Sequence, residues 1–329
     1  KNVRREVTVS QELPFEPFLF SDPHHQTIIS SVLNFLFEPS SDRKLISLPD
    51  GDKVAIEITQ PSDWRPTDLT VVLVHGLCGS HRSPNLVRMV KRLKPRGIRS
   101  VRFNMRGCGS GKGHAKHIYH SGRSEDLFEV LKVLKAQHPE SPIVLIGFSL
   151  GGNIVLKLVG ELNELGQRYL KGVIAVSPPV DLYSSVQMLG DPKNNFFERY
   201  FYKLLRADVH YRHKKFKDLP RISLPKNLKL YEFDQLYTAP TCGFHSAMDY
   251  YNKCSSAHVV EDIAIPCKIL LSEDDPIISP KSLDSFDLPK HVQVYKTKKG
   301  GHMGYLGSPR SEKGFHWLDS LLVDWILEL

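Results

Sequence analysis

The chain has 329 residues, of which 41% are hydrophobic and 24% are charged, and its formal net charge is +8. This composition is typical of a folded globular protein, and it excludes a largely disordered chain, a collagen and a coiled coil. No apolar run approaches the roughly 18–20 residues that a membrane-spanning helix needs, so we do not expect an integral membrane protein.

The cysteines and the positive charge form no recognisable motif. The five cysteines are far apart and include no C-x-x-C, which favours free thiols in a reducing compartment over a zinc site or a disulfide framework. The basic residues fall in scattered short runs without a nucleic-acid-binding motif. We therefore expect a cytoplasmic protein with a solvated basic surface that binds no nucleic acid. The chain starts at Lys1, which leaves a missing targeting or anchoring segment open.

Strands and helices alternate from residue 44 onward. The turn Pro49-Asp50-Gly51-Asp52 predicts a hairpin between the first two strands. Continuous apolar runs such as Thr70-Val-Val-Leu-Val-His75 are typical of strands buried on both faces, so the pattern predicts a mostly parallel sheet with helices on both faces. The expected strands are 44–47, 54–59, 70–75, 99–103, 143–147, 172–177, 268–271 and 292–295, and the expected helices are 85–93, 124–136, 151–165 and 315–327.

Two segments interrupt this alternation. Residues 1–43 precede the sheet, and residues 179–262 lie between two of its strands. A long insertion inside a sheet domain is usually functional or separately folded. We expect one α/β domain over residues 1–329, with an N-terminal extension (1–43) and an inserted cap (179–262).

The strongest motif is Gly147-Phe148-Ser149-Leu150-Gly151, which lies between a predicted buried strand and a predicted helix. A serine on such a tight turn projects its hydroxyl from the sheet edge, above helix N–H groups that favour negative charge. The flanking glycines let strand and helix approach closely. The pattern predicts Ser149 as a nucleophile; the alternative is a serine that only caps the helix.

A serine hydroxyl needs a base, and the base needs an acid that orients it. His302 lies in the glycine-rich loop Gly300–Gly304 after the last predicted strand, and is the best-placed base among 15 histidines. Carboxylates follow strand 268–271, and we choose Asp275 because Pro276 makes its turn rigid. Asp274 is the alternative acid.

The tetrahedral intermediate of an acyl transfer needs two N–H donors for its oxyanion. One would be the backbone N–H of Leu150, directly after the nucleophile. The other would be that of Leu77, in the loop that follows strand 70–75. We interpret His75 in this loop as structural.

These motifs together resemble the α/β-hydrolase superfamily and, within it, the YheT-like esterases, which are related to abhydrolase-domain proteins 1 and 3. The order Ser, Asp, His along the chain is the one these enzymes use. The resemblance implies an α/β-hydrolase fold and carboxylester hydrolysis without a cofactor or metal. It is carried by His75–Ser80, Asn104–Gly109, Tyr119–Gly122 with Asp126-Leu127, Gly147–Asn153, Asp274–Pro276, Gly301–Gly304, Pro23–Thr27, Phe233-Asp234, Thr238–Pro240 and Tyr250-Tyr251.

Other clusters admit two interpretations each. The repeat His114, His117, His120 suggests a metal site but is interpreted as a loop with unrelated histidines. Arg106 is expected to be buried and to order the loops of the site. In the cap, Phe196, Phe197, Tyr200 and Phe201 form an aromatic stripe at helical spacing. The stripe either packs on the sheet domain or forms the wall of an acyl pocket.

The sequence thus predicts a serine carboxylesterase that hydrolyses short- to medium-chain acyl esters through an acyl-enzyme on Ser149. Acyl transfer to an alcohol and a non-catalytic ligand-binding hydrolase fold are the alternatives. The expected partner is a small acyl ester. The apolar segment 28–37 either packs on the body of the protein or contacts a membrane from one side.

Overall fold

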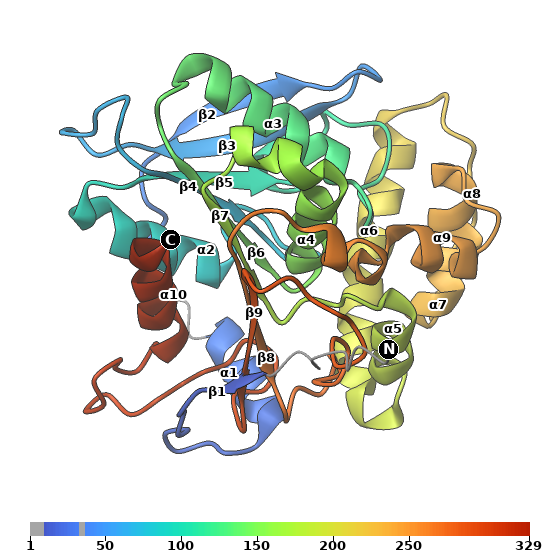
Figure 1. The fold of residues 1–329 in the computed structure, drawn as a ribbon. Helices are drawn as coiled ribbons and strands as arrows, with labels where there is room; N and C mark the ends of the chain where they lie inside the picture. Colours follow the sequence, from blue (N-terminus) through green and yellow to red (C-terminus); the bar gives the residue numbers. More distant parts are fainter. Residues whose placement is uncertain (1–9, 33–36) are drawn as a thin grey trace, which may run out of the picture.

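The computed structural model of the protein describes residues 10–32 and 37–329. These residues build a nine-stranded sheet in the order β1-β9-β8-β7-β6-β4-β5-β3-β2. The hairpin β2–β3 is antiparallel, β3 pairs antiparallel with β5, and the remaining neighbours pair in parallel. The predicted α/β-hydrolase architecture with a mostly parallel sheet is confirmed (Figure 1). The strands are β1 (Gln11–Glu12), β2 (Asp42–Ser47), β3 (Lys53–Thr59), β4 (Thr70–Val74), β5 (Arg99–Asn104), β6 (Ile143–Phe148), β7 (Gly172–Val176), β8 (Cys267–Ser272) and β9 (Val292–Thr297).

Two helix layers cover the sheet. Helices α3 (Ser124–Gln137) and α4 (Leu150–Leu162) bury their apolar faces against one side, and α2 (Pro84–Leu93) and α10 (Trp317–Glu328) cover the other. Figure 1 shows the two pairs on opposite faces. The central strand β4 contributes Val72 and Val74 to one core and Val71 and Leu73 to the other, which is why its sequence is apolar without alternation.

The segment between β7 and β8 folds into short helices beside one end of the sheet, coloured yellow to orange in Figure 1. Its longest helix is α6, and a π-helical turn at Asp234–Thr238 joins α7 to α8. The helices are α5 (Leu182–Leu189), α6 (Asn195–Lys215), α7 (Leu230–Phe233), α8 (Ala239–Cys242) and α9 (Ala247–Cys254).

The N-terminal segment lies at the β9 edge of the sheet. β1 pairs in parallel with β9, and α1 (Pro23–Val32) follows it. The apolar segment 28–37 lies partly outside the described residues, so its packing is left as predicted. No helix of the described chain has the length and apolar character needed to cross a lipid bilayer.

The boundaries of the predicted helices differ from the structure by one to three residues. Helix α3 begins at Ser124, as predicted, and the hydroxyl of Ser124 donates to Glu161. The helix predicted over 151–165 ends as an α-helix at Leu162 and continues as a 3-10 helix over Asn163–Arg168. These differences do not affect the strand ends that carry the site.

Candidate active site

Ser149 lies on the turn between β6 and α4 with backbone angles φ 50° and ψ −121°, a conformation that is strained for a residue with a side chain. The turn depends on its glycines. A Cβ on Gly147 would lie 2.2 Å from the carbonyl oxygen of Gly151, and a Cβ on Gly151 would lie 2.4 Å from the carbonyl oxygen of His75. The strain and close packing present the Ser149 hydroxyl at the sheet edge, as the motif predicts.

The structure brings Ser149, His302 and Asp275 into one hydrogen-bonded chain. Nε2 of His302 lies 2.8 Å from Oγ of Ser149, and Nδ1 lies 2.9 Å from Oδ2 of Asp275. The side chains of His302 and Asp275 are buried. The other carboxylate oxygen of Asp275 accepts the backbone N–H groups of Ile277 and Ile278 at 2.8 and 2.9 Å. Asp275 can therefore hold the imidazole in one orientation and tautomer.

Asp274, the alternative acid, has a different set of partners. Its Oδ1 accepts the hydroxyl of Ser272 at 2.6 Å and the backbone N–H of Gly301 at 2.9 Å. Gly301 directly precedes His302, so Asp274 holds the loop while Asp275 contacts the ring. The two adjacent carboxylates, Asp274 and Asp275, thus have different roles.

Helix α1 supports the same histidine loop from the N-terminal segment. Oγ1 of Thr27 accepts the backbone N–H of His302 at 2.9 Å and donates to the carbonyl of Pro23 at 2.7 Å. The fully buried Gln26 accepts the N–H of Leu306 through Oε1 at 2.8 Å. Neither Thr27 nor Gln26 was predicted to support the site. The only available signal was the resemblance carried by Pro23–Thr27.

The two predicted oxyanion donors lie beside the nucleophile. Leu77 and Leu150 both line the cavity that Ser149 faces. A Cβ on Gly76, next to Leu77, would lie 3.2 Å from Cβ of Ser149, which shows how closely the two loops approach. Within the described residues, neither backbone N–H has a hydrogen-bond partner. Two unpaired donors next to a serine hydroxyl are the arrangement that an oxyanion requires.

His75 is structural, as expected. It is fully buried, and burial lowers its pKa to about 4. Its Nε2 accepts the N–H of Met105 at 3.1 Å, so the neutral ring carries its proton on Nδ1, which donates to the carbonyl of Gly76 at 2.7 Å. The ring therefore fixes the loop that presents Leu77.

Arg106 is buried and ties the loops together. It makes two hydrogen bonds to Asp126, both at 2.7 Å, and further bonds to Asp50 and Asp52. These carboxylates raise the pKa of the guanidinium, although desolvation opposes them. His117 pairs with Asp52 at 2.9 Å, and the three atoms of Asp50, Asp52 and His117 lie close enough to hold a metal. The Arg106 cation already balances the negative charge of Asp50 and Asp52, so these carboxylates do not need a metal ion to do so.

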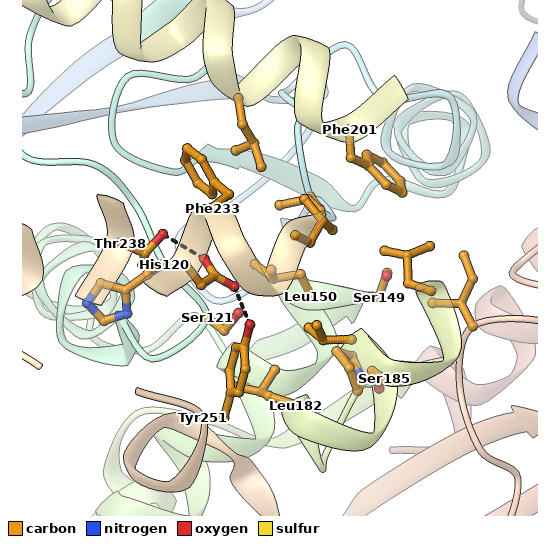
Figure 2. A pocket seen from close by; sticks show the side chains of 18 of the residues that line it. His120, Ser121, Ser149, Leu150, Leu182, Ser185, Phe201, Phe233, Thr238 and Tyr251 are labelled. Carbon is orange, nitrogen blue, oxygen red and sulfur yellow. Dashed lines mark hydrogen bonds between the residues drawn. The ribbon is translucent and has the colours of Figure 1, made fainter. Parts of the chain in front are cut away.

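A cavity of about 830 Å³, counting the space at its mouth, opens between the sheet edge and the segment 179–262. Most of its wall is apolar, and Ser149 and His302 both line it. Figure 2 shows Ser149 among the apolar lining side chains. Its lining residues are Leu77, Ile118–Ser121, Ser149, Leu150, Pro179, Leu182, Ser185, Val186, Leu189, Phe201, Leu205, Leu230, Phe233, Asp234, Thr238, Tyr250, Tyr251, Ile277, Ile278 and His302.

Only one member of the predicted aromatic stripe lies in this wall. Phe201 lines the cavity, whereas Phe196 and Tyr200 are 66% and 52% exposed. Phe197 is buried, but its ring stacks on His24 of α1 at 5.8 Å. The stripe is wider than one helix face. Successive residues point about 100° apart, so the i, i+4 face of α6 takes Phe197 and Phe201 inward and leaves the other two outside.

The chain is similar in sequence to proteins that are named as esterases. The chain is 30% identical to the putative esterase YheT of Escherichia coli (strain K12), over 93% of this chain and 91% of that one. It is 28% identical to medium-chain fatty acid ethyl ester synthase/esterase 2 of Saccharomyces cerevisiae (strain ATCC 204508 / S288c), over 74% of this chain and 60% of the other.

The fold and a family model agree with those relatives. The Pyrococcus furiosus esterase Pf2001 superposes with a TM-score of 0.56 at 18% identity, covering 96% of this chain and 98% of that one. Residues 70–309 match the model of the alpha/beta hydrolase fold family. The resemblance found from the motifs is thus confirmed, and the chain belongs to the α/β-hydrolase fold family.

Proposed function

We propose that the protein is a serine carboxylesterase acting on short- to medium-chain acyl esters. The observation that carries the proposal is the continuous hydrogen-bonded chain from Ser149 through His302 to Asp275, whose first two members line a largely apolar cavity. A hydrolase relative with 30% identity over nearly the whole chain supports it.

The chemistry follows from the positions of these groups. Oγ of Ser149 attacks the ester carbonyl while Nε2 of His302 takes its proton. The N–H groups of Leu77 and Leu150 hold the oxyanion, each donor contributing roughly 3–4 kcal/mol to the transition state. His302 then protonates the leaving alcohol. In the second half, His302 takes a proton from water, which attacks the acyl-enzyme and releases the acid. No step requires a cofactor or a metal.

The test compares the wild type with Ser149→Ala on p-nitrophenyl esters from acetate to palmitate. Loss of the nucleophile should lower kcat by up to about a million-fold. The exposed Ser311→Ala serves as the matched control and should hydrolyse at the wild-type rate. The acyl length at the maximum measures the pocket. A fluorophosphonate that fails to label Ser149, together with equal rates in both proteins, would instead leave a ligand-binding hydrolase fold.

Acyl transfer to an alcohol is a second candidate, favoured by the yeast relative named as both synthase and esterase. The same acyl-enzyme would form, and an alcohol would take the place of water at His302. Measuring the ratio of ethyl ester to free acid in ethanol-containing buffer decides between them. Formation of acid alone, at an ethanol concentration that leaves the rate unchanged, would reject the transferase.

We also propose that the outer face of α6 contacts lipid surfaces. The exposed Phe196 and Tyr200 alternate with Arg199 and Lys203 at i, i+3 and i+4 spacing around a shallow depression. Aromatic and cationic side chains on one helix face suit an anionic bilayer. The wild type should sediment with phosphatidylserine vesicles, whereas Phe196→Ser/Tyr200→Ser should stay in the supernatant. Equal fractions of both proteins in the pellet would reject the contact.

A further inference from the structure

The cavity contains a second polar region, formed by cap and loop residues that the proposed reaction does not use. Asp234 lines the cavity and keeps accessible surface there. Its carboxylate accepts the hydroxyls of Thr238 at 2.6 Å and Tyr251 at 2.7 Å. In Figure 2, Thr238 and Tyr251 lie on one side of Leu150, and Ser149 lies on the other.

This carboxylate has unused hydrogen-bonding capacity. A carboxylate offers about four lone-pair sites, and the two hydroxyls fill two of them. No ion pair joins Asp234 to a cation within residues 10–32 and 37–329. Burial raises the pKa of Asp234 to about 6, although both hydroxyls act to lower it. An acidic group without a cation in an apolar wall is costly unless something supplies donors to it.

An unpaired donor lines the same cavity. His120 is 8% exposed, and its Nδ1 accepts the backbone N–H of Gly122 at 3.1 Å. Burial lowers the pKa of His120 well below its usual range, so the ring is neutral and carries its proton on Nε2. Among the described residues, that N–H has no hydrogen-bond partner.

Tyr250 and Ser121, which also line the cavity, form hydrogen bonds with each other. The hydroxyl of Tyr250 donates to Oγ of Ser121 at 2.8 Å and accepts the backbone N–H of Ser121 at 2.9 Å. Asp234 keeps an acceptor, and His120 keeps a donor, that can receive a ligand group. A hydroxyl fits both, because it can donate to the carboxylate and accept from the imidazole N–H.

We propose that Asp234 and His120 form a polar subsite that binds a hydroxyl group on the substrate, remote from the scissile ester. The substrate class is then a hydroxyl-bearing ester, with the hydroxyl on the acyl chain or on the alcohol. The inference rests on the proposed esterase function for the ester itself, but the binding of the hydroxyl does not depend on turnover.

Calorimetric binding to Ser149→Ala tests the subsite without hydrolysis. The probes are methyl esters of straight-chain acids and of the ω-hydroxy acids of equal length, from butanoate to decanoate. In a purely apolar cavity the added hydroxyl weakens binding, because it leaves water without a partner. With the subsite, the ω-hydroxy ester of matching length binds at least about tenfold tighter than the unsubstituted ester. ω-Hydroxy esters that bind more weakly at every length would overturn the proposal.

Asp234→Asn, added to Ser149→Ala, should abolish the preference for the ω-hydroxy ester while leaving binding of the unsubstituted ester within about twofold. The matched control is Asp262→Asn, the same change at an exposed cap residue outside the cavity, which should keep the preference. An unchanged preference in Asp234→Asn would give that residue a structural role only. If this variant does not fold, the sign of the hydroxyl effect in Ser149→Ala alone still decides. An ω-amino ester that binds tighter than the ω-hydroxy ester would replace the hydroxyl by a cation and reject the His120 contact.

Two series of substrates show whether the hydroxyl belongs to the acyl or to the alcohol part of the ester. Wild-type kcat/KM is compared for p-nitrophenyl esters of ω-hydroxy acids and for monoesters of diols, each against its unsubstituted partner. A preference of at least about tenfold in one series assigns the hydroxyl to the acyl or to the alcohol side. Turnover of every ester with no preference in either series rejects the subsite alone. No turnover of any ester, together with tighter binding of the ω-hydroxy ester than of the unsubstituted one, rejects the esterase and keeps the subsite.

Discussion

The two ends of the cavity hold their carboxylates in different ways. At the sheet end, Asp275 accepts two backbone N–H groups and the imidazole of His302. At the cap end, the partners of Asp234 among the described residues are the hydroxyls of Thr238 and Tyr251. One carboxylate is bound to its own turn and to one side chain, while the other keeps acceptor sites open toward the cavity.

The difference shows what local donors do for an acidic side chain. Backbone N–H groups in a tight turn orient Asp275 and leave it one partner, which suits a residue that orients a base. Hydroxyls can rotate and supply no positive charge, so burial raises the pKa of Asp234, and its carboxylate can still take a donor from a ligand. The number of unfilled acceptor sites thus separates a positioning carboxylate from one that can bind a substrate group.

The largest expected effect comes from breaking the sheet end. Asp275→Asn should lower kcat by roughly ten thousand-fold, because the amide favours the wrong imidazole tautomer. Asp274→Asn should cost only about tenfold, through a looser loop at Gly301. Steady-state rates on one p-nitrophenyl ester compare them directly. A larger loss in Asp274→Asn than in Asp275→Asn would exchange the two roles.

A smaller effect should come from the N-terminal support of the same end. Thr27→Val removes the acceptor for the backbone N–H of His302 and keeps the side-chain shape. We expect kcat to fall roughly ten- to a hundredfold with KM nearly unchanged, because a small displacement of the base misaligns proton transfer.

Thr27→Ser is the matched control, since it keeps the hydroxyl, and it should restore most of the activity. Equal losses in Thr27→Val and Thr27→Ser would mean that the methyl group, and not the hydrogen bond, supports the loop. An increase in KM without a change in kcat would place Thr27 in substrate binding instead.

The sheet end could be predicted from the sequence because its groups are local. The Gly147–Gly151 motif, the glycines around His302 and the turn at Pro276 each lie directly after a strand that the apolar pattern reveals. Parallel strands end at the same edge, so residues distant in sequence must meet there. The choice between Asp274 and Asp275 needed the structure, since both follow the same strand.

The cap end could not be predicted in the same way. Asp234, Thr238 and Tyr251 meet through a π-helical turn and a separate short helix, whose placement no periodicity encodes. The stripe on α6 was visible, but periodicity did not say which face of the helix turns inward. Phe201 alone therefore lies in the predicted pocket wall. Thr27 was missed because its contact with His302 spans most of the chain.

The smallest expected effect concerns stability at the cap end. Burial raises the pKa of Asp234 from 3.8 to about 6, so between these values the folded protein holds a proton that the unfolded chain has lost. The contribution of Asp234 to stability is then present below about pH 4 and is lost as the pH rises through about 6. Asp234→Asn should remove this loss. Relative to the wild type, its free energy of unfolding should rise by of order 1–2 kcal/mol between these pH values, after allowing for water in the cavity.

The titratable groups around Asp234 stay neutral in this pH range, so the change in stability can be assigned to Asp234. Tyr250 and Tyr251 have raised pKa values and stay neutral, as does Cys242, and the lowered pKa of His120 keeps its ring neutral. Urea unfolding at several pH values between about 4 and 7 measures the difference in free energy between the two proteins. A difference that is constant with pH would mean that Asp234 does not titrate in this range. The contrast between the two ends of the cavity would then lie in the geometry of the hydrogen bonds alone.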